Sequence, residues 1–212
     1  MRLLVTGTDT EVGKSVITAA LASAIPGCTA VKPLASGSLP PGEDATLIAE
    51  AAGHAPHVRH CAPVPASPDR AMHEAGMYLD WSDLLAWIRA FPAPLLVEGV
   101  GGFAVPLDHT HRVSDLAVEL GYPVIIVAAN RLGVLSHTLL TAEAIFSRGL
   151  TLAGVVLNTV PGGAPEPLAR WNLADLRREL PVPVVSFPMV TTAQERRDAG
   201  VRLHAALFPP PK

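Results

Sequence analysis

Short apolar runs alternate along this chain with longer stretches in which apolar residues recur at helical spacing. A strand buried on both faces of a parallel sheet reads as a continuous run of Val, Ile and Leu, and a crossover must carry the chain back before the next parallel strand. The alternation therefore predicts an α/β fold with a parallel or mostly parallel sheet and helices on both of its faces. The expected strands are residues 2–6, 28–32, 94–98, 123–129, 152–158 and 183–187. The expected helices are residues 15–24, 44–52, 82–91, 114–120, 135–148, 168–180 and 193–207.

The length of the chain favours a single domain. The sequence has 212 residues, and 49% of them are apolar, which is enough for one well-filled domain and short for two. We place this domain at residues 1–208 and expect Pro-rich loops within it at residues 33–42, 56–68 and 161–167. Residues 209–212, "PPPK", are expected to form a flexible tail.

Composition argues against several kinds of partner. The net charge is -3 and the charges are interspersed, so the chain lacks the basic surface that nucleic-acid binding requires. The longest apolar runs, such as residues 124–129, are too short to cross a bilayer, and no secretory signal is recognisable, so we expect a cytoplasmic protein. Cys28 and Cys61 lack the paired spacing of a zinc or redox site and are expected to be buried free thiols.

Residues 5–15 read "VTGTDTEVGKS" and join an expected strand to an expected helix. This strand-loop-helix context predicts a phosphate-binding loop, in which backbone N–H groups at the helix start point at the anion. In such a loop Lys14 reaches the terminal phosphates, and the Ser15 hydroxyl is placed to ligate Mg²⁺. The loop is a variant, because five residues instead of four separate its two glycines. The alternative is a turn that merely opens a helix.

Polar side chains are expected at the ends of the predicted strands, which is where parallel sheets bind ligands. Glu98 ends an apolar strand, and a carboxylate is costly to bury there without a cation, so Glu98 and Ser15 are candidates for a Mg²⁺ site. The alternative for Glu98 is a helix cap or a solvated group. Asp44 is a weaker candidate that could simply cap the helix it begins. Lys32 precedes Pro33 at another strand end and suggests a second anion, the alternative being a solvated lysine.

Four motifs together resemble one family. They are "VTGTDTEVGKS", "VKPLASGS" at residues 31–38, "VEGVGG" at 97–102 and "GVVLN" at 154–158, and they closely resemble dethiobiotin synthetase over almost the whole chain. The resemblance implies a P-loop NTPase-like domain and an ATP-dependent cyclo-ligase of biotin biosynthesis that uses Mg²⁺ and forms a homodimer. It implies that 7,8-diaminononanoate, CO₂ or bicarbonate, and ATP become dethiobiotin, ADP and phosphate through a carbamate and a carbamic-phosphoric anhydride.

The resemblance also implies roles for individual residues. The implied catalytic residues are Lys32 and Lys14, and the implied Mg²⁺ ligands are Ser15, Asp44 and Glu98. The diamine substrate is implied to contact Thr10, Lys32 and Ser36. The implied nucleotide contacts are Glu11, Val12, Gly13, Lys14, Ser15, Val16, Asp44, Glu98, Gly99, Val100, Gly101, Asn158, Thr159, Phe187, Pro188 and Met189. Two positions depart from the family's pattern, since Ser15 stands where Thr is more usual and Asp69 where relatives tend to have His.

Several histidines leave alternatives open. His54, His57 and His60 stand beside Cys61 and invite a metal-site interpretation, but their spacing favours a solvated loop. The segment 109–111, "HTH", could approach a substrate, although an exposed loop is expected there.

Two other functional classes share the phosphate-binding loop. A switch ATPase of the membrane-partitioning or nitrogenase-iron type carries a lysine near the start of the loop, where this chain has Asp9. A regulatory module that binds a ligand without turnover need not keep Lys32 and Ser36 beside the phosphates. Both features favour the enzyme.

Overall fold

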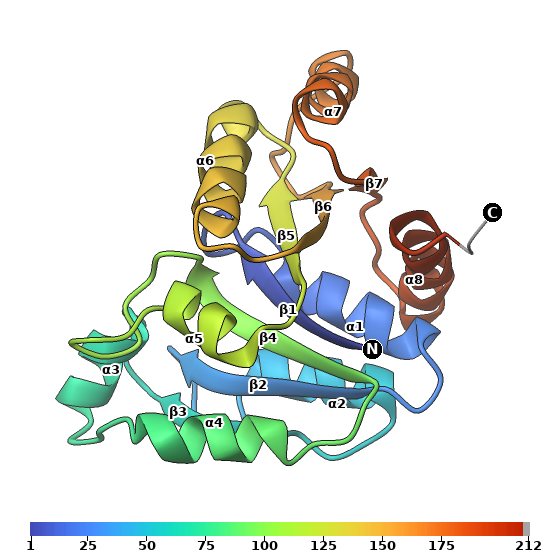
Figure 1. Ribbon diagram of the computed structural model, residues 1–212. Coiled ribbons are helices and arrows are strands. Elements are labelled where there is room, and N and C mark those ends of the chain that lie inside the picture. Colours follow the sequence, from blue (N-terminus) through green and yellow to red (C-terminus); the bar gives the residue numbers. More distant parts are fainter. Residues whose placement is uncertain (210–212) are drawn as a thin grey trace.

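Within residues 1–209, seven parallel strands form one sheet (Figure 1). The strands are β1 (Arg2–Gly7), β2 (Thr29–Ser36), β3 (Val58–Ala62), β4 (Leu95–Gly102), β5 (Val124–Ala129), β6 (Leu152–Asn158) and β7 (Val184–Phe187). Their order is β3-β2-β4-β1-β5-β6-β7, and the parallel pairing confirms the predicted fold class. The computed structural model describes residues 1–209, so most of the tail expected at 209–212 lies outside the described residues.

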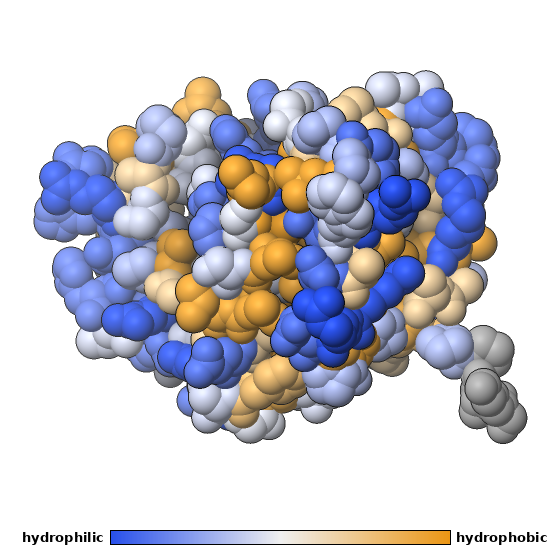
Figure 2. Space-filling view, turned by 90° about the horizontal axis from the view of Figure 1, so that it is seen from above, coloured by the Kyte–Doolittle hydropathy of each residue, from blue (hydrophilic) through white to orange (hydrophobic). Residues whose placement is uncertain are grey.

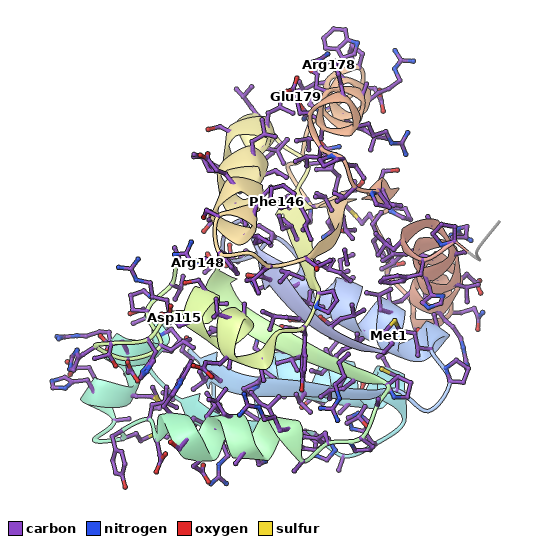
Figure 3. All side chains as sticks on the ribbon, in the orientation of Figure 1. Met1, Asp115, Phe146, Arg148, Arg178 and Glu179 are labelled. Carbon is purple, nitrogen blue, oxygen red and sulfur yellow. The ribbon has the colours of Figure 1, made fainter. Side chains whose placement is uncertain are left out.

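Helices cover both faces of the sheet, as predicted. They are α1 (Lys14–Ala24), α2 (Glu43–Ala52), α3 (Pro68–Glu74), α4 (Trp81–Arg89), α5 (Val113–Leu120), α6 (Val134–Phe146), α7 (Leu168–Glu179) and α8 (Ala193–Leu207). α1, α2 and α8 share one apolar core with Leu3 of β1, whereas α3 to α7 share the other core with Leu4. Successive strand residues point to opposite faces, which explains why neighbours belong to different cores. Figure 3 shows side chains filling the space on both sides of the sheet.

Two elements lie in or beside a segment that was expected to be a loop. Residues 58–62 form the edge strand β3 within the Pro-rich stretch 56–68, and α3 begins at Pro68. β3 pairs with β2 and is only partly buried, so its sequence, which includes Arg59 and His60, shows no apolar run. α3 has seven residues, too few for a helical repeat to be recognised. The loop prediction for 56–68 is therefore wrong at β3, and α3 was missed.

β2 and β4 both continue beyond the ends that the sequence predicts. β2 runs to Ser36 and β4 runs to Gly102, so Lys32 and Glu98 lie inside strands and not at their ends. The prediction that these two residues mark strand ends is wrong. A sequence pattern ends a strand at the first charged residue, but a buried charge inside a strand is tolerated when another part of the chain supplies its partners.

The sheet opens between β2 and β4 at the position of Pro33. Within these two strands, pairing extends only as far as Val31 opposite Val97, and from Lys32 onward β2 pairs with β3. The Lys32 N–H donates to the His57 carbonyl on the β3 side (2.9 Å), so the following residue faces the side that β4 has left. Because Pro33 has no N–H to donate, it fits this position without the loss of a ladder hydrogen bond.

Both cysteines are buried free thiols, as predicted. Burial raises the pKa of the Cys28 thiol to about 11. Cys61 lies on β3, and its thiol donates to the carbonyl of Ser38 (3.3 Å). Among residues 1–209, no helix combines the length and the apolar character needed to cross a membrane.

Candidate functional site

The loop between β1 and α1 contains two residues with left-handed backbone. Glu11 has a φ of 54° and Gly13 a φ of 88°, a region that glycine enters freely and other residues rarely adopt. The side chain of Val12, between them, is buried in the same core as α1 and anchors the loop. Gly13 stands at the N-cap of α1 and, having no side chain, leaves the N–H groups of the first turn uncapped. The loop therefore offers backbone donors to an anion, as predicted.

Asn158, at the end of β6, supports this loop through its side chain. Its side-chain amide is buried and donates to the Val12 carbonyl (3.0 Å). A Cβ atom on Gly13 would collide with the same amide, which gives the glycine a packing role as well as a conformational one. The neighbouring Thr159 is exposed, and its N–H donates to the carbonyl of Phe187 (2.9 Å). The amide of Asn158 is thus engaged with the loop.

The implied nucleotide contacts at residues 187–189 divide into a buried and an exposed part. The ring of Phe187 is fully buried in the core, so only its backbone reaches the surface side of the sheet end. Pro188 and Met189 are exposed directly after it and lie beside Thr159 through the pairing of β6 with β7. The structure therefore brings Thr159, Pro188 and Met189 together at the surface and turns Phe187 away.

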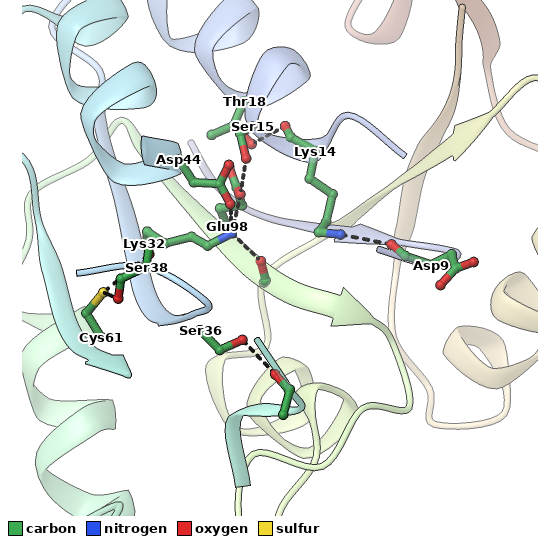
Figure 4. Close-up of polar contacts among 12 residues, drawn as sticks. Asp9, Lys14, Ser15, Thr18, Lys32, Ser36, Ser38, Asp44, Cys61 and Glu98 are labelled. Atoms are coloured by element: carbon green, nitrogen blue, oxygen red, sulfur yellow. Dashed lines mark hydrogen bonds and ion pairs between the residues drawn. The ribbon is translucent and has the colours of Figure 1, made fainter. Parts of the chain in front are cut away.

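Lys14 folds back over the loop (Figure 4). Its Nζ donates to the carbonyl of Asp9 (2.9 Å), and the side chain is buried. Burial, and after it the nearby charge of Lys32, lowers the pKa of Lys14 to about 8. The Asp9 carbonyl was not among the predicted site atoms, because a backbone acceptor leaves no signal in the sequence.

Four side chains from four elements meet beside the loop (Figure 4). The Nζ of Lys32 lies 2.5 Å from Glu98 Oε1 and 2.9 Å from Asp44 Oδ2. The Ser15 hydroxyl donates to the same Glu98 Oε1 (2.7 Å), and Lys32 also donates to the Gly99 carbonyl (3.3 Å). Glu98 and Lys32 are buried, whereas the Asp44 side chain is 53% exposed. The structure thus brings together Ser15, Lys32, Asp44 and Glu98, and neither Lys32 nor Glu98 is a solvated group.

The charges of this cluster fix its protonation. Burial alone would lower the pKa of Lys32, but the charges and hydrogen bonds of Glu98 and Asp44 outweigh it, so the pKa lies above its usual value of 10.5. Burial would raise the pKa of Asp44, but the charge of Lys32 reverses the effect, and the pKa lies below its usual value of 3.8. Lys32 is therefore an ammonium and Asp44 a carboxylate at neutral pH.

The oxygen atoms of this cluster suit Mg²⁺. Glu98 Oε2 is buried and, within the described residues, has no hydrogen-bond partner, so a cation would satisfy it. Asp44 lies in the first turn of α2 and does not cap it, since Gly42 is the N-cap, so the capping role considered for Asp44 is wrong. A hydroxyl and two carboxylates match a metal that takes few protein ligands and completes its shell with phosphates and water.

The histidines near β3 have structural surroundings. His54 Nε2 accepts the N–H of Ala30 (3.0 Å), and His57 packs against His54 and Phe91 with ring centroids 4.7 Å and 4.8 Å apart. His60 lies on β3 itself, so the solvated-loop interpretation is wrong for this residue, whereas His54 and His57 lie in the loop before β3. In residues 1–209, no group of three or more His, Cys, Asp or Glu side chains is arranged to hold a metal.

Two cavities adjoin the cluster where β2 has left β4. One, of about 790 Å³, is lined by Lys32, Asp44, Ser36 and Val100 among others. The other, of about 540 Å³, shares Ser36 and Val100 and is also lined by Thr10, Glu11 and Gly101. The predicted substrate residues Thr10 and Ser36 therefore face one cavity, and Lys32 faces the adjoining one. The Ser36 hydroxyl donates to the Ala66 carbonyl (2.7 Å), a backbone partner that the sequence could not indicate.

The glycines that follow Glu98 serve packing inside the protein. A Cβ atom on Gly99 would lie 3.3 Å from both the Val5 carbonyl oxygen and Val113 Cγ1. Gly101 has a φ of 60°, and a Cβ atom there would lie 2.7 Å from Val105 Cγ2. These contacts show why no larger residue fits, and the surface of this turn that lines the cavities comes chiefly from Val100.

The two histidines of segment 109–111 differ in their surroundings. His109 is exposed, as expected, and its Nδ1 lies 3.4 Å from Asp69 Oδ1 on α3. His111 is only partly exposed, because its ring stacks on Trp81 with centroids 4.0 Å apart and its Nδ1 lies 2.8 Å from Asp108 Oδ2. The expectation of an exposed loop therefore fails for His111, which joins α4 to the segment before α5.

Known proteins resemble this chain over most of its length. A family model described as "AAA domain" matches residues 1–194. The chain is 40% identical over 198 residues to the ATP-dependent dethiobiotin synthetase BioD of Ralstonia nicotianae, covering 84% of each chain. It is 39% identical over 197 residues to the BioD of Aromatoleum aromaticum, covering 84% of this chain and 86% of that protein. The chain belongs to the dethiobiotin synthetase family.

Family membership confirms the resemblance drawn from the four motifs and the predicted class of ATP-dependent ligase. It also decides against the switch ATPase and the regulatory module. A solved nucleotide-binding protein from Archaeoglobus fulgidus, in complex with ADP, has a TM-score of 0.49 and 15% identity, covering 94% of this chain and 86% of that chain. A likeness of this size carries no argument about function.

Replacing Asn158 by Ala should lower the free energy of unfolding by about 1–3 kcal/mol, because the buried Val12 carbonyl loses its donor. Urea unfolding followed by circular dichroism measures the change. Thr159→Ala is the matched control, since the Thr159 side chain is exposed one residue further on, and it should leave stability within about 0.5 kcal/mol of the parent. Equal stability of the two variants would show that the amide does not support the loop.

Proposed function

We propose that this protein is an ATP-dependent dethiobiotin synthetase that carboxylates 7,8-diaminononanoate with CO₂, closes the cyclic urea and releases ADP and phosphate. One observation carries the proposal. Lys32 is buried between Glu98 and Asp44, next to Ser15 of the phosphate-binding loop and at the edge of a cavity. A protein that only binds or hydrolyses a nucleotide has no need of this second cation. The names of the relatives support the same reaction.

The nucleotide is proposed to lie along the loop at the N-terminus of α1. Backbone N–H groups from Glu11 to Val16 hold the phosphates, and Lys14 exchanges the Asp9 carbonyl for the terminal phosphate. The base lies over the exposed surface of Thr159, Pro188 and Met189. When bound at Ser15, Asp44 and Glu98, Mg²⁺ neutralises charge on the phosphates.

The diamine is proposed to lie in the two adjoining cavities, where Thr10 and Ser36 offer hydroxyl groups and Lys32 offers a positive charge. An alkyl amine has a pKa of about 10.4, so using its free base near neutral pH costs roughly 4 kcal/mol. The nearby Lys32 ammonium favours the neutral amine, because a like charge disfavours the protonated form. The amine lone pair then attacks CO₂, a C–N bond forms, and loss of a proton leaves a carbamate anion.

The remaining steps need positioning and charge more than covalent catalysis. A carbamate oxygen attacks the terminal phosphorus of ATP, the bond to ADP breaks, and a mixed anhydride forms. The second amine attacks the carbamoyl carbon, phosphate leaves, and the ring closes. Lys32 stabilises the carbamate, and Lys14 stabilises the phosphoryl group during transfer. No enzyme nucleophile takes part in this sequence.

Replacing Lys14 by Ala should remove most of the thermal stabilisation that MgATP gives to the folded protein, because stabilisation by a ligand grows with its affinity and Lys14 contacts the terminal phosphates. Scanning fluorimetry with and without MgATP measures the shift in Tm. Arg202→Ala, on the exposed side of α8, is the control and should keep the full shift. If Lys14→Ala shifts as far as the control, Lys14 does not hold the phosphates.

Replacing Lys32 by Gln should lower turnover by ~10³ or more, since an ammonium about 4 Å from an anion contributes on the order of 4 kcal/mol at an effective dielectric of about 20. Mass spectrometry of the cyclic urea, with diamine, bicarbonate and MgATP saturating, measures turnover in the parent and the variant. Calorimetry should show that the variant binds MgATP at least as tightly as the parent. Lys32→Arg should not restore full activity, because a planar guanidinium cannot replace a compact ammonium between two carboxylates.

Absence of the cyclic urea in the parent would rule out the proposed reaction. A Lys32→Gln variant that turns over within about tenfold of the parent would remove Lys32 from carbamate stabilisation while leaving the reaction in place.

A homodimer is proposed on the face that carries α6 and α7. Leu132, Leu140 and Trp171 are large apolar side chains that remain exposed there, Leu132 to 84%. Figure 2, seen from the side on which α6 and α7 lie in Figure 1, shows apolar residues gathered among hydrophilic ones. Leu140 also lines a cavity of about 450 Å³ with Thr8 and Asp9, so a second copy on this face would adjoin the phosphate-binding loop.

Replacing Leu140 by Asp should convert a dimer into a 22.2 kDa monomer in sedimentation equilibrium at micromolar concentration, because the charge would be buried without a partner at the interface. Val201→Asp is the matched control, since Val201 is similarly exposed on α8, away from this face, and this variant should stay dimeric. A monomeric parent protein would contradict the dimer, and a dimeric Leu140→Asp variant would contradict the assigned face.

A further inference from the structure

Lys32 occupies the centre of the oxygen cluster to which the proposed function assigns Mg²⁺. Its ammonium bonds to Glu98 Oε1 and Asp44 Oδ2, and Glu98 Oε1 also accepts the Ser15 hydroxyl. The oxygen atoms that suit a metal are therefore already linked to one another and to a protein cation. Among the oxygen atoms of this cluster, Glu98 Oε2 is buried and has no hydrogen-bond partner within the described residues.

A metal ion and this ammonium would compete for the oxygen atoms of the cluster as it stands. Two cations bound to neighbouring oxygens of the same carboxylate repel each other strongly in a buried site, where water does not screen them. The side chain of Lys32 is 3% exposed and that of Glu98 is 0% exposed, so screening is weak. An arriving metal ion would therefore weaken the binding of the Lys32 ammonium to Glu98 and Asp44.

The buried Glu98 carboxylate also needs a cation at all times. An unpaired carboxylate in this position would be strongly destabilising. Lys32 supplies the charge in the structure described here, and a metal would supply it in the loaded enzyme. The displaced side chain of Lys32 can move into a neighbouring space, because it lines the cavity of about 790 Å³ that Ser36 and Val100 also line.

We propose that Lys32 is a resident cation that holds the metal site closed in the free protein, and that arrival of the metal with the nucleotide releases its ammonium into the substrate cavity. This inference rests on the proposed function. It makes the charge that stabilises the carbamate available only after the phosphates and metal are in place. Carboxylation is thereby linked to the presence of the phosphoryl donor through one shared carboxylate, Glu98.

The first test measures Mg²⁺ binding in the absence of nucleotide, by calorimetry. Lys32→Met should bind Mg²⁺ at least ~10-fold more tightly than the parent, because the competing ammonium is gone while the oxygens remain. Lys14→Met is the matched control, since it removes the same charge from a side chain that bonds to a backbone carbonyl and touches neither carboxylate. Its affinity should rise less than about threefold. Equal affinity in Lys32→Met and the parent, or an equal rise in both variants, would overturn the proposal.

A second test uses the unmodified protein and does not depend on how the variant folds. Acylation of Lys32 by acetic anhydride, followed by mass spectrometry, should be slow in the free protein and at least ~10-fold faster with Mg²⁺ and a non-hydrolysable ATP analogue. The same analogue in EDTA should leave Lys32 protected. If Lys32 is equally protected with and without the metal, the proposal is wrong. If the proposed function alone is wrong, Lys32 will still be acylated faster in the presence of the metal, but the protein will form no cyclic urea.

Discussion

A buried carboxylate inside a parallel strand requires a positive charge, and much of this site follows from meeting that requirement at Glu98. The residue lies within β4 and is fully buried. Lys32 reaches it from β2, and Ser15 reaches it from the start of α1, so one carboxylate oxygen links three elements. An ion pair of this kind adds little net stability over apolar packing, but loss of either partner is costly, because a buried charge is left alone. The cluster therefore fixes where β2 and α1 stand relative to β4.

The departure of β2 from β4 gives this cluster its access to ligands. Pairing of β2 with β4 ends at Val31, and two cavities lined by both Ser36 of β2 and Val100 of β4 lie beyond that point. Pro33 permits the change of partner because it has no N–H to leave unpaired. Lys32 stands at the turning point, with its backbone bonded toward β3 and its side chain bonded toward β4. The opening of the sheet and the position of Lys32 thus both follow from the change of pairing partner of β2 from β4 to β3.

The sequence predicted the central strands, the loop and the family, because these depend on local patterns: apolar runs, helical spacing and a motif. It placed the ends of β2 and β4 too early, since charged residues look like strand ends when their tertiary partners are unseen. It missed β3, whose partly buried edge carries no apolar run. Among the implied nucleotide contacts, the structure turns the ring of Phe187 into the core and the amide of Asn158 onto the loop, through contacts that no local pattern indicates. The errors gather at the site, where polar residues depart from local rules because distant segments support them.

Both lysines of the site are removed from water before any ligand arrives. Lys14 is bonded to the Asp9 carbonyl and Lys32 to two carboxylates. The cost of desolvating them is met when the chain folds, so binding of phosphate or carbamate only exchanges one partner for another. Lys14, held by a neutral carbonyl, has a pKa lowered to about 8 by burial and by Lys32, whereas Lys32, held by two anions, keeps its charge firmly. Binding of a polyphosphate at Lys14 thus replaces one backbone carbonyl, whereas the proposed release of Lys32 needs a competing cation at Glu98.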